Sequence, residues 1–407
     1  MRYASLNINL VLLLALLGMR GEPVRFSIPD DRGLVELKDN KIERADRLAP
    51  FFDKLSRLAG EKSGVVSILH IGDSHIQGDY FTGRVRGHLQ RDFGEAGRGL
   101  IMPGRPAGTN EPADLFSTGT GKWESKRVIY PDQPLRIGIS GITLSSQDSS
   151  ARLNILLKEQ TPPQLTATFF FRKDARSFMA GILDSLSRPV AFIGPYTNEF
   201  SDVSTVQFPK PTRSFGIQLM KTLPDQERLM LYGVSLSNGK PGVLYHCAGV
   251  NGAKFKHFAA AEDLGPQSAL LKPDLIVISM GSNEALDYPY KDPAFEQQMI
   301  RLTELLSRNN TGVPVLLTTP PGSFLTNKKK SPGLRMITDR ITRFAKEHGF
   351  ACYNLYDAGG GEQFAARWSR KEMLQPDGIH FTRSGYELQG DMFYLALINA
   401  YNTHVSR

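Results

Sequence analysis

The feature that most constrains the fold is a largely apolar run over residues 65–71 that ends abruptly at the turn Gly72-Asp73-Ser74. A short apolar run bounded by turn residues is typical of a strand buried on both faces of a parallel sheet. Residues 79–93 carry apolar side chains at helical spacing, so a helix is predicted directly after the turn. Ser74 then lies where a strand leads into a helix, and unpaired N–H groups there suit a developing oxyanion. The same three residues are also ordinary turn formers, which leaves a plain turn as the alternative.

The segment from residue 242 to the C-terminus alternates between strand and helix patterns. Apolar runs predict strands at 243–248, 274–280, 313–319 and 350–355, and helical spacing predicts helices at 253–261, 293–308, 334–348 and 384–401. Such alternation implies right-handed crossovers and a parallel sheet covered by helices on both faces. Residues 40–60 are predicted to form an amphipathic helix that leads into the first strand of the same sheet.

Residues 111–242 differ in character, because they show no helical periodicity of any length. Turn residues separate short alternating or β-branched runs at 127–130, 135–144, 151–157, 165–172, 190–193, 203–208, 214–220 and 229–235. This pattern predicts a β-sandwich or jelly roll that is large enough to be a domain of its own. The domain would be inserted in an α/β domain made of residues 40–110 and 243–403, with residues 94–112 as a long loop.

Five aromatic side chains of the β-rich block have two possible roles. They could form a face on which sugar rings stack, or they could belong to the core of the sandwich. The residues are Trp123, Tyr130, Phe169, Phe171 and Tyr196.

The amino-terminal residues predict export. Arg2 is followed by an apolar run at residues 10–17 that is too short to span a bilayer and is typical of a secretory signal peptide, here residues 1–22. The mature protein would then have no membrane span. A buried helix and an uncleaved anchor are the alternatives.

The composition is that of a soluble globular protein, with 41% hydrophobic and 22% charged residues in a chain of 407. That length is sufficient for two domains, and neither disorder nor a fibrous fold is indicated. The formal net charge of +8 favours anionic surroundings such as cell-wall polymers. Nucleic acid is not indicated as a partner.

Three further polar segments follow predicted strands of the parallel sheet. Gly252 lies in a glycine turn, Asn283 follows a Gly-Ser pair, and Asp377 lies three residues ahead of His380. Because the carboxyl ends of parallel strands meet at one edge of a sheet, we expect these residues near the serine turn. The Gly252 N–H and the Asn283 amide could donate to an oxyanion, and Asp377 could orient the His380 imidazole. Taken singly, each could instead be a turn residue, a helix cap or a surface pair.

Taken together, these segments resemble the four conserved blocks of the SGNH (GDSL-like) hydrolase superfamily, in the same order. The blocks are Gly72-Asp73-Ser74-His75, Gly252, Gly281-Ser282-Asn283 and Asp377-x-x-His380. The resemblance extends from about residue 62 to residue 400 apart from the β-rich block. It implies a flavodoxin-like three-layer sandwich with a parallel five-stranded sheet in the strand order 2-1-3-4-5. His75 stands where the GDSL form has Leu, and Glu284 stands where many relatives have Asp.

The inserted β-rich block narrows the resemblance. It is similar to the insert of bacterial peptidoglycan O-acetylesterases, a carbohydrate-binding-module-like β-sandwich between the first and second blocks. The resemblance implies an exported serine esterase of the periplasm or cell envelope that removes O-acetyl groups from a polysaccharide, with peptidoglycan as the leading candidate. Two alternatives stay open. One is an O-acetyltransferase of the same fold, in which a sugar hydroxyl intercepts the acyl-enzyme, and the other is a non-catalytic glycan-binding protein.

The resemblance also implies a role for each matching residue. Ser74 would be the nucleophile, His380 the general base and then the general acid, and Asp377 its orienting partner. The oxyanion hole would consist of the Ser74 N–H, the Gly252 N–H and the Asn283 side chain, with Gly249 as the rival of Gly252.

No cofactor or metal is expected. The histidines, including His70 and His75, show no spacing typical of a zinc site. His75 is expected to be a buried or supporting residue.

The two cysteines of the chain are predicted to be free thiols. The implied strand order puts Cys247 and Cys352 on strands at opposite edges of the sheet. Four strand spacings of about 4.8 Å separate them by roughly 19 Å, far beyond the limit of ~7 Å between the Cα atoms of a disulfide.

Overall fold

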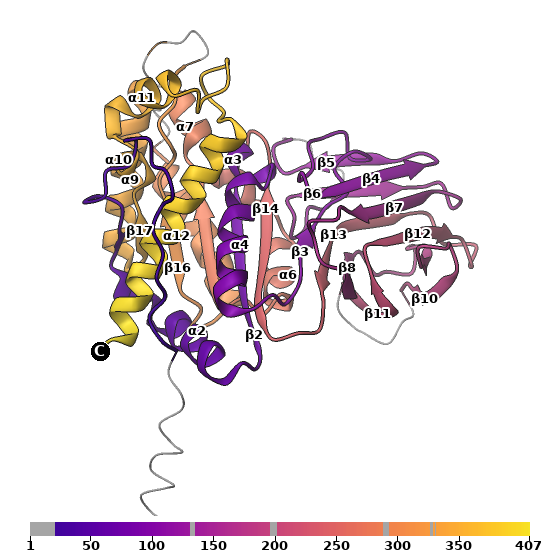
Figure 1. Cartoon of the computed structure of the whole chain (residues 1–407). Coiled ribbons are helices and arrows are strands. Elements are labelled where there is room, and N and C mark those ends of the chain that lie inside the picture. The colour runs from indigo at the N-terminus through magenta and orange to yellow at the C-terminus, as the bar shows by residue number, and fades with distance from the viewer. Residues whose placement is uncertain (1–20, 131–134, 196–201, 288–292, 326–328, 330) are drawn as a thin grey trace, which may run out of the picture.

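The computed structural model describes residues 21–130, 135–195, 202–287, 293–325, 329 and 331–407. It shows an α/β part with a β-sandwich beside it (Figure 1). Residues 1–20, which hold most of the predicted signal peptide, lie outside the described residues. Within the described ranges, no helix is both long and apolar enough to cross a membrane.

The α/β part is built on a six-stranded sheet in the order β1-β17-β16-β15-β2-β14. Its strands are β1 (Ile42–Glu43), β2 (Val65–Gly72), β14 (Gly242–Gly249), β15 (Leu275–Ser279), β16 (Val315–Thr318) and β17 (Ala351–Tyr353). The five strands from β17 to β14 are parallel and follow the order 2-1-3-4-5 that the resemblance implies. β1 adds an antiparallel strand at the β17 edge, so the sheet is mixed rather than purely parallel and has six strands rather than five.

The helix predicted over residues 40–60 is wrong in its first part. The two residues of β1 pair with β17 instead, and Arg44 takes a left-handed conformation (φ 55°) that a right-handed helix does not include. A 3₁₀ turn, η1 (Ala45–Leu48), and helix α2 (Ala49–Glu61) follow. Pro50 lies in the first turn of α2, where its fixed φ suits a helix start.

Helices cover both faces of the sheet. Alternate side chains of each strand point to opposite faces, so each face packs against its own set of helices. Besides α2, the helices are α3 (Ser74–Gln77), α4 (Tyr80–Phe93), α5 (Phe255–Ala259), α6 (Leu264–Leu270), α7 (Ser282–Leu286), α8 (Phe295–Asn309), α9 (Pro332–His348), α10 (Leu355–Ala358), η2 (Gly361–Gln363), α11 (Phe364–Arg370) and α12 (Arg383–Val405). Ile68 and Val277 share one apolar core with residues of α2, α4 and α12. Leu69 and Ile278 share the other core with residues of α8 and α9.

The β-rich block, which lies between α4 and β14 in the sequence, folds as two antiparallel sheets to one side of the α/β part (Figure 1). One sheet has the order β10-β9-β12-β7-β4, and the other has the order β11-β8-β13-β6-β5 with β3 also paired to β13. The strands are β3 (Gly99–Ile101), β4 (Leu115–Thr120), β5 (Glu124–Arg127), β6 (Ile142–Ser146), β7 (Arg152–Leu157), β8 (Gln164–Phe171), β9 (Met179–Leu183), β10 (Pro189–Ile193), β11 (Val203–Thr212), β12 (Ser214–Met220) and β13 (Leu229–Ser237).

Most sequence-predicted strands of this block are present, but two are displaced and three are missed. The runs at 127–130 and 135–144 correspond only in part to β5 and β6, and no pattern predicts β4 or β9. β3 falls inside the predicted loop over residues 94–112. With three residues it has no alternation to detect, and its strand conformation depends on pairing with the distant β13.

The aromatic side chains of the block divide between its core and its surface. Phe169 and Phe171 are fully buried, so a sugar-stacking role is wrong for these two. Trp123 and Tyr130 are half-buried, and Tyr196 lies outside the described residues.

The two cysteines lie on the strands predicted for them. Cys247 is on β14 and Cys352 is on β17, with β2, β15 and β16 between them, and both are free thiols.

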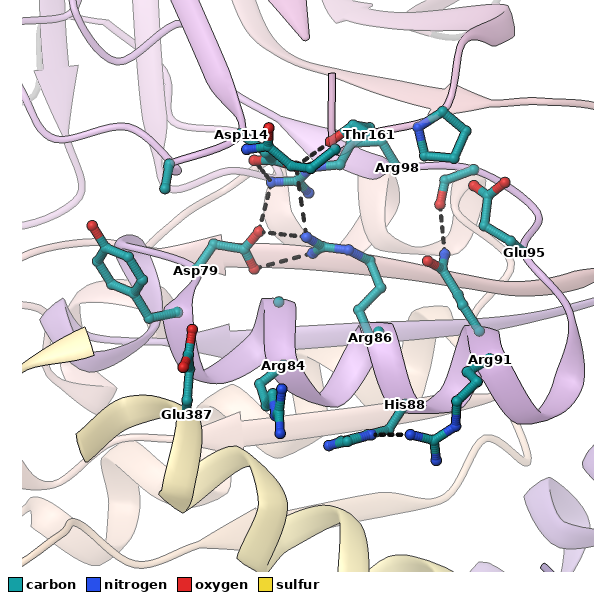
Figure 2. Close-up of a pocket in the computed structure, with 18 of the residues that line it drawn as sticks. Asp79, Arg84, Arg86, His88, Arg91, Glu95, Arg98, Asp114, Thr161 and Glu387 are labelled. Atoms are coloured by element: carbon teal, nitrogen blue, oxygen red, sulfur yellow. Dashed lines mark hydrogen bonds and ion pairs between the residues drawn. The ribbon is translucent and has the colours of Figure 1, made fainter. Parts of the chain in front are cut away.

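A buried network of four charges joins the insert to the α/β part. Arg98 donates to Asp79 at 2.6 Å and to Asp114 at 2.5 Å, and Arg86 donates to Asp79 at 2.9 Å. The network borders a cavity of about 440 Å³ between α4 and the insert, shown in Figure 2. Because Asp79 lies just beyond α3, the network holds the insert against the segment that carries the serine turn.

Candidate active site

The chain turns sharply at Ser74 because of the two residues before it. Gly72 has no room for a side chain, since a Cβ there would lie 2.3 Å from Ile76 Cγ1. Asp73 caps α3, and its Oδ1 accepts from the His75 N–H at 3.0 Å. The Ser74 N–H has no acceptor within the described chain, so it remains available to a ligand.

His380 lies within hydrogen-bond reach of Ser74. His380 Nε2 is 3.0 Å from Ser74 Oγ, and His380 Nδ1 is 2.7 Å from Asp377 Oδ2. The other carboxylate oxygen of Asp377 accepts from the N–H groups of Ile379 at 2.9 Å and of His380 at 3.0 Å. Burial raises the pKa of Asp377, but these hydrogen bonds outweigh that effect and hold the pKa below its ordinary value. An ionised carboxylate, an imidazole and a hydroxyl in this order can transfer the hydroxyl proton to the imidazole.

Two glycines are candidates for a backbone donor in the oxyanion hole. Gly252 has a positive φ of +79°, and within the described residues its N–H has no acceptor. Gly249 has a packing reason to be glycine, because a Cβ there would lie 2.3 Å from the Gln77 nitrogen. The structure therefore favours the Gly252 N–H as a donor to a ligand.

Asn283 lies in the first turn of α7 and is bonded to the segment that follows Gly252. Its Nδ2 donates to the Ala253 carbonyl oxygen at 2.9 Å. A primary amide has two N–H bonds, so a second one is left for a ligand. This hydrogen bond holds two candidate oxyanion donors, the Gly252 N–H and the Asn283 amide, next to each other.

Glu284 adds a second link between the same two segments. It is fully buried, and its Oε1 accepts from the Phe255 N–H at 2.8 Å. Lys254 forms an ion pair with Asp287, just after α7. Burial raises the pKa of Glu284 to about 7, and the nearby charge of Asp73 adds to the rise. Glu284 therefore holds α7 against the segment that follows Gly252, and its buried side chain is not placed to contact a substrate.

Gln77 is a residue of the site that the sequence does not reveal. Its Oε1 accepts from the Asn251 N–H at 2.6 Å, and its Nε2 donates to Thr109 Oγ1 at 2.7 Å and to the Asn110 carbonyl at 3.0 Å. One side chain thus joins α3, the Gly252 turn and the segment that leads into the insert. No motif contains this glutamine, and only its place three residues after Ser74 could have pointed to it.

The two histidines near the serine turn have structural environments. His70 Nδ1 is 2.6 Å from Tyr245 Oη and its Nε2 is 2.6 Å from Ser279 Oγ, and burial lowers its pKa to about 3. His75 is buried, as expected, with its Nδ1 3.0 Å from Tyr386 Oη. In the part of the chain that the structure describes, no group of three or more His, Cys, Asp or Glu side chains is arranged to hold a metal ion.

A comparison with known families finds one matching family model. Residues 226–388 match the model of the GDSL-like lipase/acylhydrolase family. The chain therefore contains a domain of this class, which supports membership of the SGNH superfamily. The match includes the Asp377 and His380 block, whereas Ser74 lies before it on the other side of the insert.

Among solved structures, a peptidoglycan O-acetylesterase has a TM-score of 0.74 and 19% sequence identity, and the match covers 91% of this chain and 100% of that chain. The likeness in fold therefore includes the insert. An acetyl xylan esterase matches with a TM-score of 0.30 and 17% identity over 38% of this chain and 80% of its own. A family two carbohydrate esterase from Cellvibrio japonicus matches with a TM-score of 0.29 and 10% identity over 70% of this chain and 99% of its own. No curated protein matches the chain.

Proposed function

We propose that this protein is an exported serine esterase that removes O-acetyl groups from a polysaccharide. The observation that carries the proposal is the 3.0 Å separation of His380 Nε2 and Ser74 Oγ, with Asp377 on the other ring nitrogen. These are the positions of a nucleophile, a general base and the carboxylate that orients the base.

The reaction proceeds through an acetyl-enzyme. His380 Nε2 takes the proton of Ser74 while Oγ bonds to the acetyl carbonyl carbon, and the oxyanion accepts from the Ser74 N–H, the Gly252 N–H and the Asn283 amide. The tetrahedral intermediate collapses as the bond to the sugar oxygen breaks, and His380 gives its proton to that oxygen. Water then loses a proton to His380 and attacks the acetyl-enzyme. Acetate leaves, and the proton returns to Ser74 Oγ.

Two features support a polymeric substrate. The side chains of His380 and Asp377 are 42% and 48% exposed, so an acetyl group on a large chain can reach Ser74. The insert, over residues 111–242, also reaches the site, because a Cβ on Gly252 would lie 3.6 Å from Ile129 Cδ1. We assign the insert the role of holding the glycan.

The likeness in fold to a peptidoglycan O-acetylesterase makes O-acetylated peptidoglycan the first substrate to test. That substrate, together with the signal peptide predicted over residues 1–22, would place the protein in the periplasm or cell envelope.

The test is acetate release from O-acetylated peptidoglycan and from acetylated xylan by the wild type, Ser74→Ala and Asn283→Ala. We expect no release by Ser74→Ala and a loss of roughly 10² to 10³ in kcat for Asn283→Ala, the cost of one oxyanion donor. Full activity of Ser74→Ala would refute the proposal. Transfer of acetyl to an added sugar acceptor, in place of free acetate, would identify an O-acetyltransferase. Inertness of the wild type toward both polymers and p-nitrophenyl acetate would instead indicate a glycan-binding protein.

A further inference from the structure

A small cavity of about 20 Å³ lies behind the Ser74 turn. Its lining comes from the turn itself, α4, α7, α12 and the segments that follow β15 and β16, and it includes Asp73, His75, Ser282 and Gln389. A volume of roughly 10 to 15 Å³ on this measure is enough for one water molecule, provided that polar groups surround it.

Three polar atoms of this lining are buried and have no hydrogen-bond partner in the described part of the chain: Asp73 Oδ2, His75 Nε2 and Gln389 Nε2. The three residues are 1%, 7% and 2% exposed. A buried polar atom without a hydrogen-bond partner lowers the stability of the folded protein. Three of them around one cavity therefore point to a common partner.

We propose that one water molecule binds in this cavity and joins Asp73, His75 and Gln389. The three atoms match the bonding capacity of a single water, which forms about three hydrogen bonds when buried in a protein. Gln389 Nε2 donates, and an ionised Asp73 carboxylate accepts.

The match holds for both tautomers of His75. Burial lowers the pKa of His75 to about 3, so the ring is neutral and one nitrogen carries the proton. If Nδ1–H donates to Tyr386 Oη, the water accepts from Gln389 and donates to both Asp73 and His75 Nε2. If Nε2 carries the proton, the water accepts from Gln389 and His75 and donates to Asp73.

The hydroxyl of Ser282 also interacts with the Asp73 carboxylate and lowers its pKa, although burial dominates and raises that pKa to about 6. A carboxylate has about four lone-pair sites, so it can accept from Ser282 and from the water together. The Ser282 hydroxyl therefore does not take the place of the water.

The site has a consequence for the proposed reaction. Asp73 and His75 flank Ser74, whereas Gln389 lies on α12, which begins three residues after His380. The water therefore links the two segments that hold Ser74 Oγ and His380 Nε2 at 3.0 Å. Gln389 becomes a positioning residue, and this step rests on the proposed function, whereas the water site itself does not.

The water site is tested by a crystal structure of the wild type at a resolution that shows ordered water. We expect one water at about 2.7 to 3.2 Å from Asp73 Oδ2, His75 Nε2 and Gln389 Nε2. A cavity without ordered density, or side chains rotated to bond one another, would overturn the site.

The positioning role is tested with Gln389→Met, which keeps the length of the side chain but removes its donor. We expect the crystal structure of this variant to lack the water, and kcat for p-nitrophenyl acetate to fall about tenfold while KM stays within about twofold. Asn399→Leu, an amide-to-aliphatic change on the exposed face of α12, is the matched control and should leave kcat unchanged. An unchanged kcat in Gln389→Met, with the water lost, would overturn the positioning role. An active Ser74→Ala would instead remove the proposed function and leave the water site standing on the crystal structure.

Discussion

Gln77 Oε1 accepts a hydrogen bond of 2.6 Å from the Asn251 N–H, which joins the helix that begins at Ser74 to the turn that contains Gly252. One side chain thereby sets the separation of two proposed oxyanion donors. The same side chain donates to Thr109, in the segment that leads into the insert. A movement of the insert would therefore shift Gln77 and, through it, the turn that contains Gly252.

Gln77→Ala should impair the proposed reaction without abolishing it. The variant loses three hydrogen bonds, so the Gly252 turn can shift relative to Ser74, and we expect kcat for p-nitrophenyl acetate to fall on the order of tenfold with little change in KM. Gln90→Ala is the matched control, because Gln90 also donates to two backbone carbonyls but lies away from the site on α4. Equal kcat values in the two variants would contradict a positioning role for Gln77.

Glu284→Gln should change how stability depends on pH. Burial raises the pKa of Glu284 in the folded protein from its ordinary value of 4.5 to about 7. Stability from the neutral side chain is therefore fully present below pH 4.5 and is lost as the pH rises through about 7, an effect on the order of 3 kcal/mol. Glutamine keeps the acceptor for Phe255 but does not ionise. In urea unfolding at pH 5 and pH 8, the wild type should lose stability relative to the variant at the higher pH. If the free energy of unfolding changed equally in the two proteins between pH 5 and pH 8, Glu284 would already be ionised in the folded state at pH 5.

Arg98→Met should destabilise the protein strongly. The side chain of Arg98 is 1% exposed, and its removal leaves two buried carboxylates, Asp79 and Asp114, with Arg86 as the remaining cation. Breaking a buried ion pair on one side costs about 3 to 5 kcal/mol. Arg308→Met is the control, since Arg308 forms an exposed pair with Glu304 and should change the free energy of unfolding by less than about 1 kcal/mol. Similar urea midpoints for the two variants would rule out a structural role of the buried network.

Thiol titration should find no reactive cysteine in the folded protein and two in denaturant without reductant. Burial raises the pKa of both Cys247 and Cys352 to about 12, so neither forms a thiolate near neutral pH. Their positions on β14 and β17 prevent a disulfide between them. A count of zero thiols after denaturation would contradict the strand order of the sheet.

The alternation of strands and helices and the place of the β-rich insert could be predicted from the pattern of apolar residues, whereas the order of the parallel strands could be predicted only from the resemblance to a known superfamily. Features that depend on neighbours far away in the sequence could not. β1 forms because Ile42 and Glu43 meet the edge strand β17, and nothing in the local pattern of residues 40–60 reports that edge. The burial of Phe169 was undecidable for the same reason, since both faces of a strand in a sandwich can carry aromatic residues.

The approach of Ser74 and His380 could be predicted from the sheet only in part. Ser74 directly follows β2, at the edge where the carboxyl ends of the strands meet. Three helical elements, α10, η2 and α11, lie between β17 and His380, so the place of His380 could be predicted only from the resemblance to a known superfamily. Gln77 and Gln389 were not predictable. Gln77 was singled out by the hydrogen bonds of its amide group, and Gln389 by the cavity that its side chain borders. A glutamine on a helix gives no sign of either in the sequence.

Ser74 and His380 are 306 positions apart in the sequence, and this separation sets the time between their synthesis on the ribosome. At about 5 to 20 residues per second, the ribosome completes the histidine roughly 15 to 60 seconds after the serine. During that interval the growing chain holds a hydroxyl without its base. If Ser74 and His380 act together as proposed, esterase activity cannot appear before His380 has been synthesised.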